Sequence, residues 1–548
     1  MNLFNVFVLC ANLFLVRCGI IPEELYRLDI VHYNDFHDRF EETSVLYPVC
    51  LTNDTKCVGG FARLYHEVQA LLKEKPNALL LNAGDTFQGT YWYTLYKWNI
   101  TQTFINMLPN DAHAIGNHEF DDGVAGIAPY LAALHAPVVA ANINTSKEPA
   151  LDGLYKPHVI LERKGRRIGI IGLITPETGI SSNSGRVQFH DPVQTAKKEA
   201  KDLTEEGVDI IILLSHCGLE VDKAIARNVG ENIDIIVGGH SHSLLWNGES
   251  PSKESVAGPY PVILESQSKP GHKILVVTAS AFTKYLGNLT IYFDQHGELQ
   301  SFDGSPIFLN RSIPEDPQMK KLLQPYADKL HTLVQETVGF ANDDLLANDC
   351  GAAECAIGDM IADSFMNSTK EYLKNNKMKD TKPHVVFLLR NMIRGSIAKG
   401  VITRGGIINT LPFTNSVMTF SLLGEHLIEA FERCLTNYWV AHPFNGPWMP
   451  HVSGVQLTLN ARNGTATVLI KDGDAYRPLD PEKLYQVTSL NFLTRGGNGF
   501  KMIAENARNV TFIGKDADIF EGYIRKMSPI MTSLDGRLKV LNEEKIES

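Results

Sequence analysis

An octapeptide at residues 114–121, Ala-Ile-Gly-Asn-His-Glu-Phe-Asp, places an amide, an imidazole and two carboxylates directly after a glycine. Asn117 can offer a neutral carbonyl oxygen to a metal ion, while His118 can polarise or protonate a phosphate oxygen. Asp121 follows three residues later, near enough to hydrogen-bond the His118 ring and orient it. A polar turn before a helix would have a similar composition. The octapeptide therefore predicts a catalytic site only if other segments supply the remaining ligands.

Six further side chains of metal-binding type follow predicted strands elsewhere in the chain. They are Asp35, His37, Asp85, His216, His240 and His242. Any one of these histidines alone would more often be an ordinary surface or hydrogen-bonded residue. Together with Asn117, the set provides three oxygen ligands and four imidazoles, which suffice to hold two divalent ions.

Two neighbouring ions need a shared ligand, because a carboxylate between them lowers their mutual repulsion and fixes them at roughly 3.5–4 Å. We assign that role to Asp85. One ion is then expected to be completed by Asp35, His37 and His242. The other is expected to be completed by Asn117, His216 and His240. Oxygen and imidazole ligands suit zinc, manganese or iron, and calcium or magnesium are alternatives that the sequence does not separate.

Apolar strand-like segments alternate with helical patterns through the first half of the chain. The strands are expected at 28–33, 78–81, 112–115, 138–141, 168–174, 210–214 and 233–237. The helical patterns lie at 61–73, 127–134, 193–206 and 221–228. This alternation predicts a layered α/β domain. Each polar motif follows a strand, which is where open α/β sheets place their sites.

The pattern changes at an amphipathic stretch, 314–338, which we interpret as a helix that connects two domains. Beyond it we expect helices at 357–374 and 424–438 and strands at 384–389 and 417–422. The predicted organisation is a leader (1–19), a first domain (20–312), a connecting helix (313–340) and a second domain of mixed α/β class (341–548). A chain of 548 residues is too long for one core, in agreement with this division.

The net charge and the two ends of the chain indicate which partners and which cellular compartment to expect. A net charge of −11 without a Lys/Arg cluster argues against nucleic-acid binding. The apolar run 3–16 is too short to span a bilayer and is typical of a cleaved signal peptide, with a buried first strand or helix as the alternative. The polar end, 538–548, predicts no membrane anchor. Eight glycosylation sequons fit a secretory route. They lie at Asn53, Asn99, Asn144, Asn288, Asn310, Asn367, Asn463 and Asn509.

The cysteines agree with a secreted, extracellular protein. Cys50 and Cys57 bracket one short loop, and Cys350 and Cys355 bracket another, so both pairs are expected to form local disulfides. Zinc binding by these four cysteines is the alternative, although no histidine flanks them at finger spacing. If Cys10 and Cys18 leave with the leader, Cys217 and Cys434 remain, and both are expected to be buried and unpaired. The oligomeric state cannot be predicted from the sequence.

These motifs, in this order, resemble the calcineurin-like metallophosphoesterases and specifically the 5′-nucleotidase/apyrase family. The N-terminal resemblance lies in Asn-Asp-Phe-His-Asp-Arg-Phe-Glu at 34–41, Asn-Ala-Gly-Asp at 82–85, Gln-Gly-Thr at 88–90, and 116–121. The C-terminal resemblance lies in Leu-Pro-Phe at 411–413, Asn-Phe-Leu at 491–493 and Gly-Gly-Asn-Gly-Phe at 496–500. Without an anchor, the chain looks most like the secreted salivary apyrases and 5′-nucleotidases of blood-feeding arthropods. The resemblance implies a four-layer α/β/β/α metallophosphoesterase domain followed by a mixed α/β substrate-binding domain.

The resemblance also implies roles for residues that spacing alone would leave as core or surface positions. Phe413 and Phe492 are expected to stack on a nucleotide base, although core packing is their ordinary role. Arg394 and Arg39 are expected to grip phosphate, although solvent-exposed charge is the ordinary reading of an arginine. Hydrolysis would use water activated by two metals, with His118 stabilising or protonating the phosphoryl oxygens and Asp121 orienting it.

Three departures from the family pattern affect the nucleotide site. Gly351 stands where the family has an arginine, and Asn498 replaces an aspartate that binds ribose hydroxyls. The family's Asn-Gly-Gly-Gly-Ile-Arg is here Leu-Arg-Asn-Met-Ile-Arg at 389–394. Arg390 and Asn391 could replace the lost groups from a shifted position.

We therefore expect hydrolysis of extracellular ATP and ADP, with AMP as a further candidate, and a consequent action against platelet aggregation and haemostasis. One alternative is a catalytically inactive secreted binder that sequesters nucleotides or blocks a host receptor. Another is an enzyme that cleaves nucleotide sugars or cyclic nucleotides.

Overall fold

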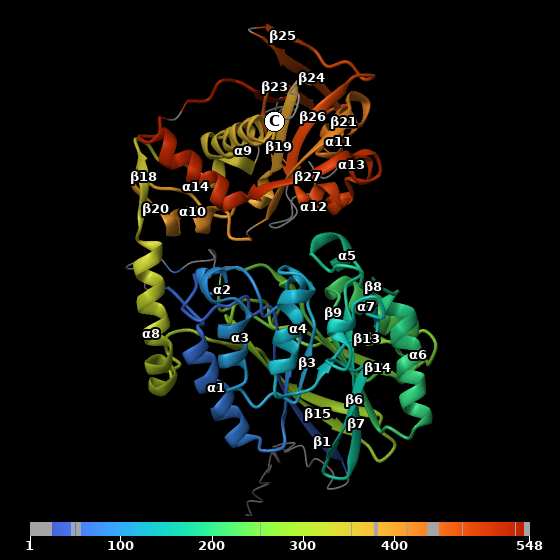
Figure 1. The fold of residues 1–548 in the computed structure, drawn as a ribbon. Helices are drawn as coiled ribbons and strands as arrows, with labels where there is room; N and C mark the ends of the chain where they lie inside the picture. The colour runs from blue at the N-terminus through green and yellow to red at the C-terminus, as the bar shows by residue number, and fades with distance from the viewer. Residues whose placement is uncertain are drawn as a thin grey trace, which may run out of the picture.

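The computed structural model describes residues 25–44, 50, 56–252, 254–351, 353–377, 382–413, 415–435, 449–473, 475–531 and 533–541. The expected leader at 1–19 and the sequon at Asn53 lie outside these residues. The fold is a mixed α/β arrangement of two parts joined by one helix (Figure 1).

The first part contains two facing sheets. One has the strand order β16-β15-β1-β2-β3-β4, with β17 also paired to β15. Its strands are β1 Tyr26–Tyr33, β2 Leu79–Asn82, β3 Ala112–Ala114, β4 Val138–Val139, β15 Tyr285–Phe293, β16 Leu299–Gly304 and β17 Ile307–Phe308. The other has the order β13-β14-β10-β9-β7-β6. Its strands are β6 His158–Arg163, β7 Arg166–Ile174, β9 Ile210–His216, β10 Ile235–Gly238, β13 Val262–Glu265 and β14 Lys273–Val277.

Alternation along β1 shows why the sheets form layers, because successive side chains point to opposite faces. Leu28 and Ile30 pack into the core between the two sheets, while Val31 and Tyr33 pack into the core beneath the outer helices. The outer helices on that side include α1 Phe61–Glu74, α2 Tyr91–Tyr96, α3 Trp98–Ile105 and α4 Val124–Ala133. The second sheet is covered by α6 Pro192–Glu205 and α7 Leu219–Val229, which gives helix, sheet, sheet and helix in succession (Figure 1).

The expected connecting helix is α8, Pro317–Val334. Asp316 caps it by accepting a 2.8 Å hydrogen bond from the Met319 amide, and Pro317 occupies the first turn, where its missing N–H has no cost. Met319, Leu323 and Leu330 lie on its buried face at helical spacing. The helix packs against α1 and α2 on one side and against α10 on the other.

The second part is built on a sheet of order β22-β19-β26-β21-β27. Its strands are β19 His384–Leu389, β21 Ser416–Leu423, β22 Pro450–Ser453, β26 Leu484–Leu490 and β27 Arg508–Lys515. Val386 and Leu388 face the core under α9 Ala356–Asn375, while Val385 and Phe387 face the core under α11 Gly424–Arg433 and α13 Lys501–Asn506. A smaller sheet has the order β25-β24-β23-β28. Its strands are β23 Val455–Asn460, β24 Thr465–Asp472, β25 Ala475–Pro478 and β28 Leu538–Leu541.

The shorter elements complete the chain. The helices are α5 Thr178–Ser181, α10 Arg404–Thr410, α12 Asn491–Thr494 and α14 Asp516–Met527. The strands are β5 Ile143–Asn144, β8 Gln188–Phe189, β11 Leu244–Leu245, β12 Val256–Gly258, β18 Thr337–Ala341 and β20 Gly400–Thr403. The main strands and helices expected from the sequence are present, with ends shifted by a few residues. The domain boundaries themselves stay a prediction.

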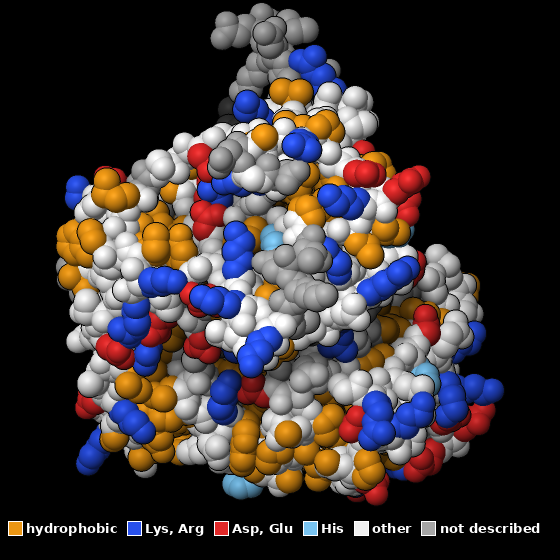
Figure 2. Space-filling view, turned by 45° about the horizontal axis from the view of Figure 1, so that its top comes forward, with side chains coloured by type: hydrophobic (Ala, Val, Ile, Leu, Met, Phe, Trp, Pro, Cys, Tyr) orange, Lys and Arg blue, Asp and Glu red, His pale blue; other side chains and the backbone are white. Residues whose placement is uncertain are grey.

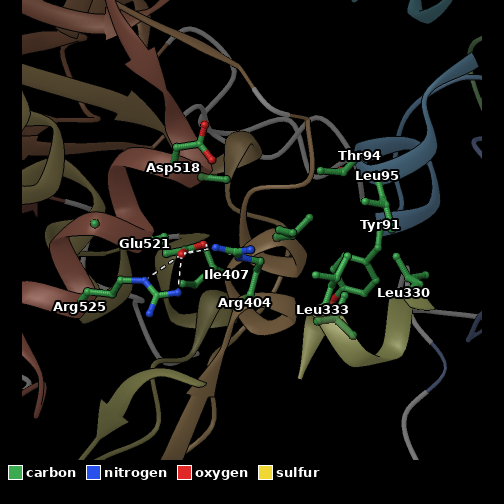
Figure 3. A pocket seen from close by; sticks show the side chains of 14 residues that line it. Tyr91, Thr94, Leu95, Leu330, Leu333, Arg404, Ile407, Asp518, Glu521 and Arg525 are labelled. Atoms are coloured by element: carbon green, nitrogen blue, oxygen red, sulfur yellow. Dashed lines mark hydrogen bonds and ion pairs between the residues drawn. The ribbon is translucent and has the colours of Figure 1, made fainter. Parts of the chain in front are cut away.

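The two parts touch through polar contacts, and a cavity of about 420 Å³ lined by Tyr91 lies between them. The Tyr91 hydroxyl of α2 donates a 2.5 Å hydrogen bond to the Gly405 carbonyl of α10, and Arg495 donates to the Ser182 carbonyl. Figure 3 shows Tyr91 and Leu333 on one side of the cavity and the Glu521–Arg525 pair on the other. The cavity therefore lies where the connecting helix meets both parts.

The cysteines follow the sequence-based expectations. Cys50 is bonded to Cys57 and Cys350 to Cys355, while Cys217 is free and buried. Cys434 is also free and buried. On the face drawn in Figure 2, Lys and Arg side chains lie among Asp and Glu side chains. In the part of the chain that the structure describes, no helix is both long and apolar enough to cross a membrane.

Candidate metal centre and nucleotide site

The seven expected metal ligands lie at the carboxyl ends of β1, β2, β9 and β10 and in the turn that follows β3. Because β1, β2 and β3 are parallel neighbours, and β9 and β10 are parallel neighbours, their ends meet at one edge of each sheet. The structure brings six of these residues together in two groups, and the seventh, Asn117, directly precedes His118, whose amide is bonded to Asp85. In each group the candidate ligand atoms lie within 4.8 Å of one another. The first group is Asp35, His37 and His242. The second is Asp85, His216 and His240.

Asp85 lies between the two groups. Its Oδ2 is 3.1 Å from His216 Nε2 and 3.7 Å from His37 Nε2. In the first group, His242 Nε2 is 3.1 Å from Asp35 Oδ1 and 3.2 Å from His37 Nε2. This is the position that a bridging carboxylate requires, and it supports the sequence-based assignment of Asp85.

Several buried ligand atoms in this cluster lack a hydrogen-bond partner. They include Asp35 Oδ1, Asn117 Oδ1 and His216 Nε2. Buried polar atoms are hydrogen-bonded in the large majority of cases, so unpartnered oxygen and imidazole atoms in both groups need an explanation. The donor set suits divalent cations, and such ions would complete all three atoms. The residues present therefore fit a two-metal centre.

The charge states of the imidazoles also fit a two-metal centre. Burial lowers the pKa of His37 to about 3 and that of His240 to about 4, so both rings are neutral and can share a lone pair with a metal. For His216, burial is outweighed by the nearby Asp85 carboxylate, which raises the pKa to about 9. Burial also opposes ionisation of Asp85, yet the His216 and His118 imidazoles hold the pKa of this carboxyl well below its usual range. A cation would compete with the His216 proton for the same electron pair.

Backbone carbonyls orient the ligand rings. His37 Nδ1 is 2.9 Å from the Phe87 carbonyl, and His216 Nδ1 is 2.7 Å from the Ala83 carbonyl. These bonds leave Nε2 of each ring toward the cluster, which is how metal-binding histidines are commonly held. Asn34, which we did not single out from the sequence, donates a 2.6 Å hydrogen bond to Asp35 Oδ2.

Glu119 is the main residue that sequence reasoning missed. Its buried carboxylate accepts hydrogen bonds from the amides of Asp85 (3.0 Å), Thr86 (2.6 Å), Phe87 (3.3 Å) and Gly116 (2.6 Å). The Thr86 hydroxyl adds a fifth at 2.7 Å. Glu119 thus ties the loop after β2 to the loop after β3. Its place inside the 114–121 octapeptide was a signal, but its partners are remote in sequence.

His118 and Asp121 form the pair expected from their spacing. His118 Nδ1 is 2.7 Å from Asp121 Oδ2, and the His118 amide donates a 2.9 Å hydrogen bond to Asp85 Oδ1. Burial disfavours the charged ring, but Asp121 and Asp85 outweigh it and raise the pKa of His118 to about 10. The ring centroid lies 5.1 Å from that of His37, so His118 borders the metal cluster.

Arg39 is not a surface charge. It is 5% exposed, its guanidinium carbon lies 4.6 Å from the Phe282 ring centroid, and its Nε has no hydrogen-bond partner. Phe282, which the sequence did not single out, also contacts the His37 and His242 rings at 5.4 and 5.0 Å between centroids. A buried cation with unused donors beside a metal cluster is suited to an anionic substrate group.

The expected nucleotide residues of the second part lie on loops and short helical turns. Phe413 stacks on His118 with ring centroids 6.0 Å apart and planes 17° apart, and Arg394 lies over the same Phe413 ring at 5.0 Å. Gln88 donates a 3.2 Å hydrogen bond to the Phe413 carbonyl. Through Phe413, the second part therefore reaches His118 of the first.

Phe492 has a different environment. It is half-buried against the two cores of the second part, and its ring lies so close to Gly497 that a Cβ there would be 2.4 Å away. Among the described residues, no ring contact joins Phe413 and Phe492. Asn498 adopts a left-handed backbone (φ 54°), and its carbonyl accepts from Arg433 while its Nδ2 lacks a partner.

Arg390 and Asn391 lie in the turn after β19. Arg390 Nη1 donates a 2.6 Å hydrogen bond to the Ile393 carbonyl, and its Nε has no hydrogen-bond partner. The buried Asn391 Oδ1 also lacks one. Both residues thus carry unused polar atoms in the segment that leads to Arg394.

Comparison with known proteins agrees with this geometry. Residues 28–244 match the calcineurin-like phosphoesterase family, and residues 337–505 match the 5′-nucleotidase C-terminal domain family. The chain is 41% identical over 529 residues to an apyrase of Tabanus yao, covering 94% of each chain. It is 36% identical to a 5′-nucleotidase of Homo sapiens, covering 94% of this chain and 91% of that protein.

A solved structure is similar over the same length. The 5′-nucleotidase precursor from Thermus thermophilus superposes with a TM-score of 0.77 at 33% identity, covering 95% of this chain and 100% of that one. The expected resemblance is confirmed, and together with the two His/Asp groups it implies divalent metal cofactors. The chain belongs to the 5′-nucleotidase/apyrase family and is a metallophosphoesterase-type nucleotide hydrolase.

Proposed function

We propose that this chain is a secreted enzyme that removes terminal phosphates from extracellular ATP and ADP, with AMP as a further candidate substrate. The observation that carries the proposal is the meeting of two His/Asp groups at Asp85, beside His118 and the buried Arg39. Two disulfides and the sequons support secretion. Removal of ADP outside the cell would act against platelet aggregation and haemostasis.

The metal ions would be held as the geometry suggests. Asp35, His37 and His242 would hold one ion, Asn117, His216 and His240 the other, and Asp85 would touch both. The chemistry that divalent cations supply in such a site is Lewis acidity toward phosphoryl oxygens and activation of a water.

The chain's own residues would then handle charge and protons. His118 carries a proton, because Asp121 and Asp85 raise its pKa to about 10. With Nδ1 held by Asp121, its Nε2 is the nitrogen that can donate to a phosphoryl or leaving oxygen. Arg39 would add a fixed positive charge to the phosphate side, in surroundings from which water is excluded.

The nucleotide end of the substrate would be bound from the second part. A base can stack on Phe413 in place of, or beside, the His118 ring, and Arg394 over the same ring can pair with a phosphate. Phe492 would form the second face of the base site, and Asn498 would hydrogen-bond the ribose. Arg390 and Asn391 carry unused polar atoms where the family pattern is changed, which supports accommodation of a polyphosphate.

The deciding experiment compares phosphate release from ATP, ADP and AMP by the full chain after chelation and after return of zinc, calcium or magnesium. Release from ATP and ADP with little from AMP would support the proposal. Release from AMP alone would replace it with an ordinary nucleotidase. No release from any nucleotide by metal-loaded protein would favour the secreted binder, and cleavage of only nucleotide sugars or cyclic nucleotides would favour the other alternative.

A further inference from the structure

A second group of carboxylates lies in the other half of the chain, on elements that the metallophosphoesterase site does not use. Glu354 belongs to the loop closed by the Cys350–Cys355 disulfide, Asp359 to the first turns of α9, and Asp535 to the segment before β28. One oxygen from each lies within 4.8 Å of the other two. Three separate segments therefore direct negative charge at one point.

The burial of Asp359 distinguishes this group from an acidic cluster on the surface. The residue is 4% exposed, and neither of its carboxylate oxygens has a hydrogen-bond partner. The nearest cation is Arg537, whose Nε is 3.8 Å from Asp359 Oδ2. Arg537 is already engaged, at 2.8 Å with Asp363 and at 2.7 Å with Asp535. A buried carboxylate left in this state carries a large desolvation cost unless something else pairs with it.

Glu354 is held so that it can face the same point. Its Oε1 accepts hydrogen bonds from the Asp535 and Gly536 amides, both at 3.0 Å, and its Oε2 accepts one from the Leu538 amide at 3.2 Å. The two bonds to Oε1 occupy both of its lone pairs, whereas Oε2 keeps a second lone pair after its single bond. The carboxylate is thus oriented by the backbone and can still bind a ligand.

We propose that Glu354, Asp359 and Asp535 bind a hard divalent cation, for which Ca²⁺ is the probe. Carboxylate oxygens alone, without sulfur or imidazole, are the ligands that calcium and magnesium prefer over zinc. Asp359 offers two oxygens without hydrogen bonds, and Glu354 offers Oε2. Asp535 is paired with Arg537 through both of its oxygens, but its exposed edge admits water, so the group suits the flexible coordination of calcium. The ion would tie the disulfide loop, α9 and the strand β28 to one another.

The competing account is a shared proton. Burial and the neighbouring Glu354 carboxylate raise the pKa of Asp359 to about 8, although Arg537 opposes the shift. A proton between Asp359 and Glu354 would relieve the same repulsion. The two accounts differ in their response to calcium and to an isosteric amide at position 359.

The test uses the full chain with zinc in fixed excess, so that the histidine-rich site stays filled, and titrates CaCl₂ at constant ionic strength. Extracellular calcium modules bind at about 10⁻⁴–10⁻³ M, which sets the range of the titration. At tenfold excess over the dissociation constant, the Tm of the second half should rise by about 3–5 °C. The Asp359→Asn variant should lose this rise. Glu371→Gln, on the same helix but paired with Lys526, should keep it.

A second variant, Asp535→Asn, keeps the proposal testable if Asp359→Asn does not fold, because the Asp535 side chain is 54% exposed. It should shift the calcium midpoint at least tenfold. An unchanged Tm of the original protein across the titration would overturn the proposal, and so would an equal rise in Asp359→Asn. Phosphate release from zinc-loaded Asp359→Asn should remain, so a failure here is distinguishable from a failure of the hydrolase proposal.

Discussion

Glu119→Gln is the substitution that best tests how the metal cluster is held. Glu119 does not contact the expected metal position, but its two oxygens gather the amides of the loop that carries Asp85 and of the turn that carries Asn117. Glutamine has nearly the same shape and replaces one acceptor oxygen with an NH₂ group. That group would face amides that are themselves donors.

The expected loss of metal affinity can be estimated from the hydrogen bonds that Glu119→Gln removes. If glutamine keeps its oxygen at the Oε1 position, the Asp85 and Gly116 amides lose their acceptor, and these bonds measure 3.0 and 2.6 Å. Two hydrogen bonds to a charged group contribute together about 3–6 kcal/mol at most. Part of this is recovered as the loops relax, and substitution of residues that hold metal ligands in place typically weakens metal affinity by about 10–100-fold. That range corresponds to about 1.4–2.8 kcal/mol.

The assay is competition for zinc with a chelator, followed by phosphate release at saturating metal. Metal affinity is expected to fall by about 10–100-fold, with partial recovery of turnover when zinc is in excess. Glu220→Gln is the matched control, because that side chain is 82% exposed and pairs only with Lys223 in this region. Unchanged affinity and unchanged turnover in Glu119→Gln would refute the view that this carboxylate positions the ligand loops.

Three further predictions concern the catalytic histidine, the base and a buried acid. His118→Ala should keep its metal, measured by elemental analysis, and lose about 10²–10⁴-fold in kcat, whereas exposed His135→Ala should lose nothing. Phe413→Ala should raise KM for ATP by about 5–150-fold, the equivalent of about 1–3 kcal/mol of stacking, and leave hydrolysis of a phosphomonoester without a base intact. Exposed Phe512→Ala serves as its control. Burial raises the pKa of Asp516 to about 7, so the folded chain keeps a proton that the unfolded chain releases above pH about 4. By urea unfolding, Asp516→Asn should therefore lose up to about 4 kcal/mol less stability than the original protein between pH 4 and pH 7, whereas exposed Asp518→Asn should behave like the original.

The meeting of the expected ligands in two His/Asp groups could be predicted because its signal is local. Asp35 and Asp85 each follow a buried parallel strand within a few residues, and parallel strands bring their carboxyl ends to one edge. Asp121 could be placed on His118 for the same reason, since three residues separate them. The strands could be located from their apolar runs alone. The sheets around the site therefore have the layered α/β class that these runs predict.

Other contacts could not be predicted, because their partners are distant in sequence. Glu119 binds amides 32 to 34 residues away, and Phe282 reaches His37 from a much later loop. The stacking of Phe413 on His118 depends on how the two parts of the fold meet. For Phe492 the sequence motif is local and predicts stacking on a base. In the structure its ring packs on Gly497 and on the core.

The backbone at the metal ligands explains why the cluster can be organised before an ion arrives. Five of the expected ligands have positive φ, a conformation that costs an ordinary residue about 1–2 kcal/mol and that Asp and His adopt more readily than most. They are Asp35 (50°), His37 (50°), Asp85 (56°), His240 (73°) and His242 (51°). Neighbouring loops hold them there, with the Asp35 amide bonded to Gly84 at 2.9 Å and the His37 amide to Asp85 at 3.0 Å. Because backbone bonds rather than the ion offset this strain, loosening them through Glu119→Gln should appear as weaker metal binding and not as loss of the fold.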